Sequence, residues 1–161
     1  MITRRALVSV TLMIVITILT TLVGGCVESF EKVTGSGELT TWDFDHKDFK
    51  RIEAGSGFKL DIAKSDSYLV RITFDNNLLQ YLDIKKKGDI LHIGLEPKYN
   101  YSNCAHSAHI TLPDLRELNL SGTSQVKIKG FQSSHAMRFE LSGNSSININ
   151  DLEAGDIRCE I

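Results

Sequence analysis

Two related stretches near the C-terminus carry the main structural signal of this chain: LNLSGTSQVKIKGF at residues 118–131 and FELSGNSSININDL at residues 139–152. The second repeats the first at a constant offset of 21 residues, and eight of the fourteen positions agree in type. Each unit has two short alternating apolar runs joined by a Ser-Gly pair, where glycine can adopt a positive φ without steric cost. The repeat therefore predicts parallel coils in which Leu120 stacks on Leu141 and Val126 on Ile147.

The repeat continues into the last five residues, IRCEI at 157–161. With the offset shortened by one, this segment lies beneath the strand that contains Phe139. A further Ser-Gly pair would fall just beyond Ile161, so we expect a domain that is truncated inside a coil. Alternation places Cys159 on the apolar face, which predicts a small buried side chain. A disulfide between Cys104 and Cys159 stays open as an alternative.

The rest of the chain from about residue 42 alternates apolar and polar residues with a period of two. Its runs are short and bounded by Gly, Asp, Asn, Ser or Pro, which is typical of half-buried strands. Only residues 76–81 could form a helical turn, and this segment is too short for a packed helix. We therefore expect an all-β domain over residues 42–161, in the form of a right-handed parallel β-helix or β-solenoid with coils of about 21 residues.

The N-terminal segment, residues 1–25, has the layout of an export signal: a basic start, an apolar run over residues 6–23, and two glycines before Cys26. The sequence VGGC at 23–26 resembles a lipobox, the bacterial signal in which a cysteine receives lipid and becomes the new N-terminus. We expect lipidation of Cys26 and attachment to a membrane through that lipid. An uncleaved N-terminal helix is the alternative anchor, because this almost unbroken apolar run of 18 residues is near the minimum length for a bilayer span.

Either anchor places the remaining chain in the cell envelope, membrane-anchored and outside the cytoplasm. Residues 26–41 contain a Gly-Ser-Gly sequence and few periodic apolar residues. This composition predicts a flexible tether between the anchor and the domain.

Composition limits the possible functions. The chain has 161 residues, 18 Lys and Arg against 20 Asp and Glu, and a formal charge of -2. This length suits one globular domain, and the absence of a basic surplus argues against a nucleic-acid partner held by phosphate contacts. No sequence motif calls for a cofactor, so we expect none.

A combination of motifs resembles the head GIN domain family over residues 51–161. It comprises the export signal with its lipobox-like cysteine, Gly-Asp-Ile-Leu at 88–91, Leu-Pro-Asp-Leu at 112–115, and the repeated Leu-Ser-Gly. Members are described as auto-transporter adhesins, and this chain would be one of lipoprotein type. The literal Gly-Ile-Asn tripeptide is absent here. The resemblance implies a fold and an envelope location, and it assigns no binding residues.

The densest cluster of candidate ligands is YNYSNCAHSAH at residues 99–109. Cys104, His106 and His109 are metal-ligating residue types that could surround one ion if this segment looped. Alternatively, the segment is an exposed loop followed by a strand whose outer face displays His109. Tyr99 and Tyr101 could stack on sugar rings or insert into a partner surface.

The Ser-Gly pairs are interpreted as turns, since Ser121 and Ser142 lack the Gly-x-Ser-x-Gly context of a nucleophile. We therefore expect a non-enzymatic cell-envelope lipoprotein whose β-solenoid surface serves adhesion or binds an envelope polymer or protein. The alternative is a small carbohydrate-active or metal-dependent site centred on the Tyr99 to His109 loop.

Overall fold

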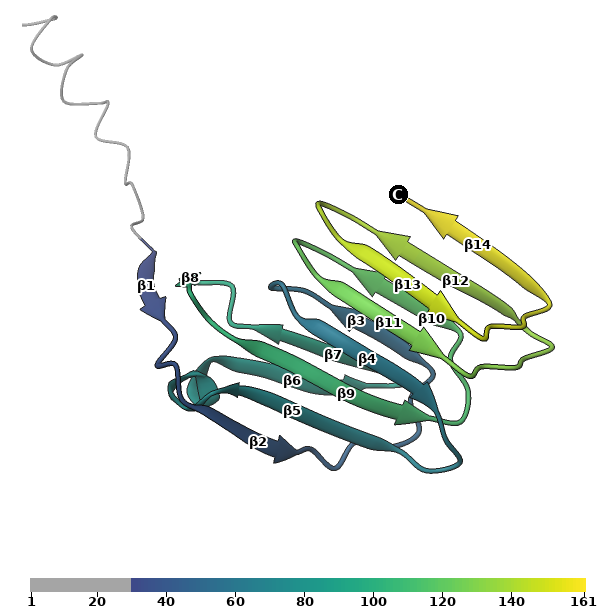
Figure 1. The fold of residues 1–161 in the computed structure, drawn as a ribbon, viewed down its shortest axis with the longest axis horizontal. Coiled ribbons are helices and arrows are strands. Elements are labelled where there is room, and N and C mark those ends of the chain that lie inside the picture. Colours follow the sequence, from purple (N-terminus) through teal and green to yellow (C-terminus); the bar gives the residue numbers. More distant parts are fainter. Residues whose placement is uncertain (1–29) are drawn as a thin grey trace, which may run out of the picture. The chain divides into compact units, whose positions relative to one another are not determined.

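The computed structural model describes residues 30–161, within which Glu31–Ile161 form one compact unit. This unit contains fourteen strands and one short 3-10 helix, η1 (Asn76–Tyr81), arranged in two six-stranded sheets and one two-stranded sheet (Figure 1). The predictions of an all-β domain and of a single helical turn at 76–81 are confirmed. The expected export signal and Cys26 lie outside the described residues.

The first large sheet, sheet I, has the strand order β14-β12-β10-β3-β7-β6. Its strands are β3 (Arg51–Ala54), β6 (Leu82–Lys87), β7 (Ile90–Leu95), β10 (Glu117–Leu120), β12 (Ala136–Leu141) and β14 (Asp156–Glu160).

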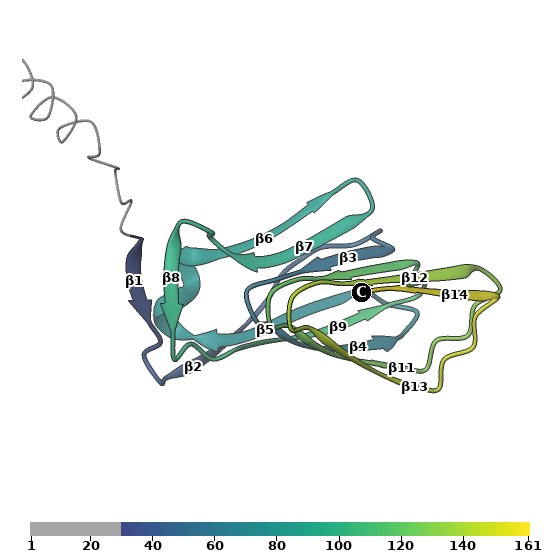
Figure 2. The same cartoon turned by 90° about the horizontal axis from the view of Figure 1, so that it is seen from above.

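The second large sheet, sheet II, has the order β13-β11-β4-β9-β5-β2. Its strands are β2 (Leu39–Asp43), β4 (Lys59–Lys64), β5 (Leu69–Asp75), β9 (His106–Leu112), β11 (Gln125–Lys129) and β13 (Ser146–Asn150). Figure 2 shows the two sheets as two layers. The small third sheet pairs β1 (Glu31–Thr34) in parallel with β8 (Tyr99–Ser102).

The strand register at the C-terminal end is the one that the repeat predicts. Leu120 pairs with Leu141 in sheet I and Val126 with Ile147 in sheet II, both in parallel. The last strand follows with the offset shortened by one, so that Cys159 pairs with Phe139. The chain turns from sheet I to sheet II at glycines with positive φ, at Gly122 (72°) between β10 and β11 and at Gly143 (71°) between β12 and β13.

An earlier segment, residues 51–64, joins these coils although it lies far upstream in the sequence. Ile52 pairs with Leu118 on one side and with Leu91 on the other. Leu60 likewise pairs with Val126 and with Ala108. Strands β3 and β4 are therefore central in their sheets, and the chain between them and the repeat forms the other half of each sheet, together with β2 at the edge of sheet II.

That other half differs from the expected uniform run of parallel coils, because three of its strand pairs are antiparallel: β2 with β5, β5 with β9, and β6 with β7. A tight turn at Gly88, with φ of 61°, joins β6 directly to β7, and two strands joined so closely can pair only in opposite directions. The turn between them projects from the sheet in Figure 2.

The tether prediction for residues 26–41 is wrong from Glu31 onward. Residues Glu31–Thr34 form β1, and residues Leu39–Asp43 form β2 on the edge of sheet II. These two strands are short and mostly polar, and Val33 is their one buried side chain. The sequence therefore shows no clear apolar alternation there. The backbone pairing partners of the two strands lie at least 28 residues away, at β5 and β8.

The buried side chains form one cluster that draws residues from both large sheets. One ladder of isoleucines crosses sheet II through the paired residues Ile110, Ile62, Ile128 and Ile149. The first three are fully buried, whereas Ile149 on the edge strand is only half-buried. Burial therefore decreases toward β13 and β14.

Cys159 shows the same decrease in burial. It is exposed, as are all five residues of β14, so the prediction of a buried side chain is wrong. The reason is that β14 is an edge strand with a neighbour on one side only. Cys104 and Cys159 are both free thiols.

Candidate functional site

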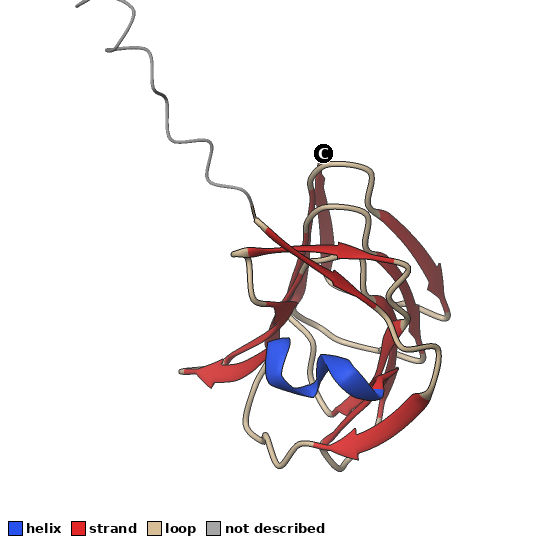
Figure 3. Ribbon diagram, turned by 90° about the vertical axis from the view of Figure 1, so that its left-hand side faces the viewer, coloured by secondary structure: helices blue, strands red, loops and turns tan. Residues whose placement is uncertain are grey.

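The tyrosines of the predicted binding segment, Tyr99 and Tyr101, lie on β8 and pack against Tyr81 at the end of η1. The ring centroids of Tyr81 and Tyr99 are 4.7 Å apart, and those of Tyr81 and Tyr101 are 6.1 Å apart. The Tyr101 hydroxyl donates a hydrogen bond to the Glu96 carbonyl (2.9 Å), and burial raises the pKa of Tyr101 to about 12. Both tyrosines are half-buried and adjoin the core. Figure 3 shows η1, which ends at Tyr81, in blue. Ligand binding by these tyrosines stays a prediction.

The two histidines of the predicted metal site face opposite sides of β9, as residues three apart in a strand must. The ring of His106 packs 4.5 Å from that of Phe58, and its Nε2 donates to the Ser56 carbonyl at 2.7 Å. Burial lowers the pKa of His106. His109 points outward, where its Nδ1 lies 3.0 Å from Oδ2 of Asp61.

Cys104, the third proposed ligand, precedes β9 and is half-buried. Its thiol donates to the Ser102 carbonyl at 3.4 Å, and burial raises the pKa of Cys104, which disfavours the thiolate that metals bind. Over residues 30–161, no group of three His, Cys, Asp or Glu side chains is placed to hold a metal ion. The structure does not bring Cys104, His106 and His109 together.

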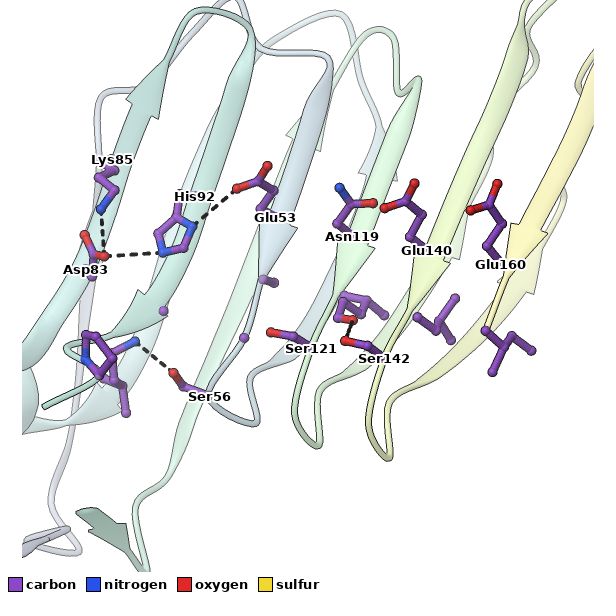
Figure 4. Close-up of a pocket in the computed structure, with 18 residues that line it drawn as sticks. Glu53, Ser56, Asp83, Lys85, His92, Asn119, Ser121, Glu140, Ser142 and Glu160 are labelled. Atoms are coloured by element: carbon purple, nitrogen blue, oxygen red, sulfur yellow. Dashed lines mark hydrogen bonds and ion pairs between the residues drawn. The ribbon is translucent and has the colours of Figure 1, made fainter. Parts of the chain in front are cut away.

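Two grooves lie instead on the outer faces of the large sheets. Groove I, of about 750 Å³, crosses sheet I and is shown in Figure 4. Side chains from successive strands line it in a row, because outward residues in paired strands occupy matching positions. The row runs from His92 on β7 to Glu160 on β14 through the paired residues Glu53, Asn119 and Glu140.

Hydrogen-bond acceptors dominate groove I. Its histidine, His92, lies between two carboxylates, with Nε2 3.3 Å from Asp83 Oδ2 and Nδ1 3.7 Å from Glu53 Oε2. The corner serine Ser142 donates its hydroxyl to the Leu120 carbonyl at 3.2 Å, which fits its interpretation as a turn residue. Within residues 30–161, no hydrogen bond joins a serine of this groove to His92. The arrangement suits binding of polar groups and shows no activated nucleophile.

Groove II, of about 800 Å³, crosses the outer face of sheet II. One row of its lining is charged and contains Asp61, His109 and Arg71 at paired positions of β4, β9 and β5. A parallel row carries hydroxyl, amide and amine groups. In register, that second row consists of Ser146, Gln125, Lys59, Ser107 and Thr73.

Sequence reasoning missed both grooves, although part of the signal was present. The 21-residue offset that stacks the apolar residues also stacks the polar residues between them, such as Asn119 beside Glu140 and Gln125 beside Ser146. The pairing of these rows with β3, β4, β7 and β9 depends on contacts between distant segments, which the repeat does not specify. Cys26 lies outside the described residues, and within residues 30–161 no helix is long and apolar enough to cross a membrane.

The fold and its grooves define a class of protein: an all-β unit of two mixed sheets whose hollows lie on open, polar outer faces. The family follows from a match of residues 48–161 to the family model described as "Putative auto-transporter adhesin, head GIN domain". The chain belongs to this family, which confirms the resemblance seen in its motifs.

Solved structures share the fold at low sequence identity. A "putative adhesin" from Parabacteroides distasonis superposes with a TM-score of 0.73 at 19% identity. The aligned region covers 80% of this chain and 55% of the Parabacteroides distasonis chain. A "putative adhesin" from Bacteroides fragilis has a TM-score of 0.73 at 20% identity, and the aligned region covers 79% of this chain and 60% of the Bacteroides fragilis chain. A "Putative lipid binding protein" from Parabacteroides distasonis has a TM-score of 0.61 at 19% identity, and the aligned region covers 80% of this chain and 63% of that protein. This chain thus spans 55 to 63% of the length of these structures. No curated protein matches it.

Proposed function

We propose that this protein is a non-enzymatic, cell-envelope adhesin whose stacked β-solenoid coils present their outer faces to a polymer or protein partner. The observation that carries the proposal is the register of outward polar side chains, which forms continuous rows across five strands in each large sheet. Such rows offer repeated hydrogen-bonding positions at the strand spacing of about 4.8 Å, and a partner with its own regular repeat can use several at once. The family description supports the same function.

Adhesion is favoured over two other functions. One structural neighbour is named for lipid binding, but both grooves here lie on polar outer faces and the described interior is a continuous cluster of buried side chains. A carbohydrate-active or metal-dependent site at the Tyr99 to His109 segment has little support, because the side chains that would form it face different surroundings.

Retention on coated surfaces tests adhesion. Bacterial cells that express the full chain, and matched cells without it, are passed over surfaces coated with separate polysaccharides and matrix proteins. We expect selective retention of the expressing cells on at least one coating, and equal retention on every coating would contradict the proposed function.

The anchoring part of the proposal rests on the lipobox-like sequence before Cys26. In this proposal a lipid on Cys26 holds the domain at the membrane, outside the cytoplasm. Mass spectrometry of the mature N-terminus should find a lipid-modified Cys26, and Cys26→Ser should release the chain from the membrane fraction. An unmodified Cys26 with the preceding residues still attached would favour the uncleaved helix as the anchor.

A further inference from the structure

The outer face of sheet II carries a positive charge surplus in a chain whose total charge is negative. Alternation with the buried residues assigns its outward side chains, and the paired registers align them across the sheet. Among the solvent-accessible side chains of this face, four Lys and Arg residues stand against two Asp residues, Asp43 and Asp61, on a chain of net charge -2, while a third carboxylate, Asp75, is buried. The four cationic residues are Lys59, Arg71, Lys127 and Lys129.

Two of these cations are already neutralised by neighbours. Arg71 makes a two-pronged contact with Asp43, at 2.7 Å from Nε to Oδ1 and 2.8 Å from Nη2 to Oδ2. Oδ2 of Asp61 accepts from Lys129 Nζ at 3.3 Å and from His109 Nδ1 at 3.0 Å. Both solvent-accessible carboxylates of the face are therefore occupied.

The other two, Lys59 and Lys127, form no ion pair with any described residue. Both line groove II, on neighbouring strands β4 and β11. Lys127 lies across from Asp61 in register, yet the carboxylate of Asp61 is engaged by His109 and Lys129 instead. Two uncompensated ammonium groups thus border one hollow, which favours an anionic occupant.

The neighbouring row supplies uncharged hydrogen-bonding groups. Ser146, Gln125, Ser107 and Thr73 line the same groove from four strands, with Lys59 between Gln125 and Ser107. Hydroxyl and amide groups both donate and accept, as sugar hydroxyls do. A chain of sugars that crosses the strands would meet one such group at each strand.

We propose that groove II binds an anionic polysaccharide that lies across the strands of sheet II, with its acidic groups at Lys59 and Lys127 and its hydroxyls on the hydroxyl and amide row. This inference rests on the proposed adhesive function and names its ligand class. A single-stranded nucleic acid fits less well, because the outward residues that line this groove include no Phe, Tyr or Trp on which bases could stack.

The test measures binding of the purified full chain to soluble polymers of matched length. Dextran sulfate and carboxymethyl dextran supply sulfate and carboxylate groups, unmodified dextran supplies hydroxyls alone, and a thymidine oligonucleotide supplies phosphates and bases. We expect one or both acidic dextrans to bind, with sulfate and carboxylate told apart by their affinities. Binding should weaken as salt rises from about 0.05 M to about 0.5 M, because the Debye length shortens.

The double variant Lys59→Gln, Lys127→Gln isolates the groove. We expect it to lower the affinity for the acidic dextran about tenfold, as the loss of two charge contacts would. The matched control is Lys86→Gln, Lys87→Gln, which removes the same charge at the exposed end of β6 and should leave affinity within about twofold. Equal losses in the two double variants would assign binding to net charge and overturn the proposal.

Other outcomes also overturn it. Failure of both acidic dextrans to bind, equal binding by unmodified dextran, or tighter binding by the oligonucleotide would each exclude the proposed ligand class. The retention assay separates this failure from that of adhesion itself. If cells that carry Lys59→Gln, Lys127→Gln are retained to the same extent as unmodified cells, only the proposed ligand class is contradicted. If unmodified cells are not retained on any coating, the adhesive function itself is contradicted.

Discussion

The C-terminal coils and the N-terminal part of the described unit reach the same two-sheet architecture by different means. In the coils, each strand repeats the contacts of the one before, so Leu118 pairs with Phe139 just as Phe139 pairs with Cys159. In the N-terminal part, single contacts without a repeat hold the strands. A stacked repeat tolerates a gradual loss of burial at its end, while a structure built on unique contacts depends on each of them.

The clearest unique contact is the carboxylate of Asp75 at the end of β5, only 1% exposed. Its Oδ1 accepts from the Gly37 backbone N–H at 2.8 Å, and its Oδ2 accepts from that of Ala105 at 2.7 Å. Asn77 adds a hydrogen bond from its amide to the Thr34 carbonyl at 2.8 Å. These contacts hold the connection between β1 and β2 against the core.

The largest effect expected concerns the isoleucine ladder that crosses both regions. Ile62→Ala removes a fully buried side chain from a central strand and should lower the free energy of unfolding by about 4 kcal/mol. Ile149→Ala, in the same ladder but half-buried on the edge strand, should cost about 1 kcal/mol, because its site is already partly hydrated. Urea denaturation measures both, and equal losses would contradict the decrease in burial toward the C-terminal end.

The next effect concerns Asp75. Asp75→Ala leaves two backbone donors without their charged acceptor and should lower the free energy of unfolding by about 3 kcal/mol. Hydrogen exchange should accelerate first at Gly37 and in β2, while amides of β11 keep their protection. Asp66→Ala, at an exposed position, is the control and should change stability little. Uniform acceleration across both regions would argue against a locally acting contact.

A smaller effect separates the stacked corners from an isolated turn. At Gly143, φ is +71°, and an added Cβ would lie 2.6 Å from the Gly122 carbonyl oxygen in the coil beside it. Gly143→Ala should therefore cost about 2 kcal/mol, from backbone strain plus the displaced corner. Gly88→Ala has a similar φ of +61° but open space around it and should cost about 1 kcal/mol. Thermal unfolding compares the two, and an equal shift would show that the corners do not pack tightly.

The smallest effect is a pH dependence that belongs to the N-terminal part. Burial against Phe58 lowers the pKa of His106 below its usual 6.5 in the folded chain. As pH falls through 6.5, the unfolded chain takes up this proton before the folded chain does, so stability is lost on acidification. Between about pH 7 and pH 5 the free energy of unfolding should therefore fall as the pH is lowered.

His106→Gln should flatten that part of the stability profile, while His135→Gln, at an exposed position in the C-terminal coils, is the control. Denaturation curves recorded across the pH range provide the measurement. An unchanged slope in His106→Gln would assign the pH dependence to other groups.

Much of the C-terminal half could be predicted from the chain itself, because its signal is local and repeated. The offset between residues 118 and 139 predicts the pairing of Leu120 with Leu141, and the same offset shortened by one predicts which strand Cys159 joins. The alternation failed to predict that Cys159 is exposed, since burial depends on a neighbouring strand and not on the residue's own pattern. For the segment with Cys104, His106 and His109, the alternative of a strand that displays His109 on its outer face is confirmed. The interpretation as a loop around one ion does not describe this segment, because a regular strand separates the two histidines onto opposite faces.

Alternating residue types determine from sequence alone that the chain forms strands and which side of each strand faces inward, because side-chain direction in a strand depends only on position. The neighbour of each strand is a property of the tertiary structure. Leu60 lies between Val126 and Ala108, and β1 joins β8, through pairings that span tens of residues. Both grooves arise from such pairings. No local pattern specifies them, since their free energy comes from packing that exists only once distant segments have met.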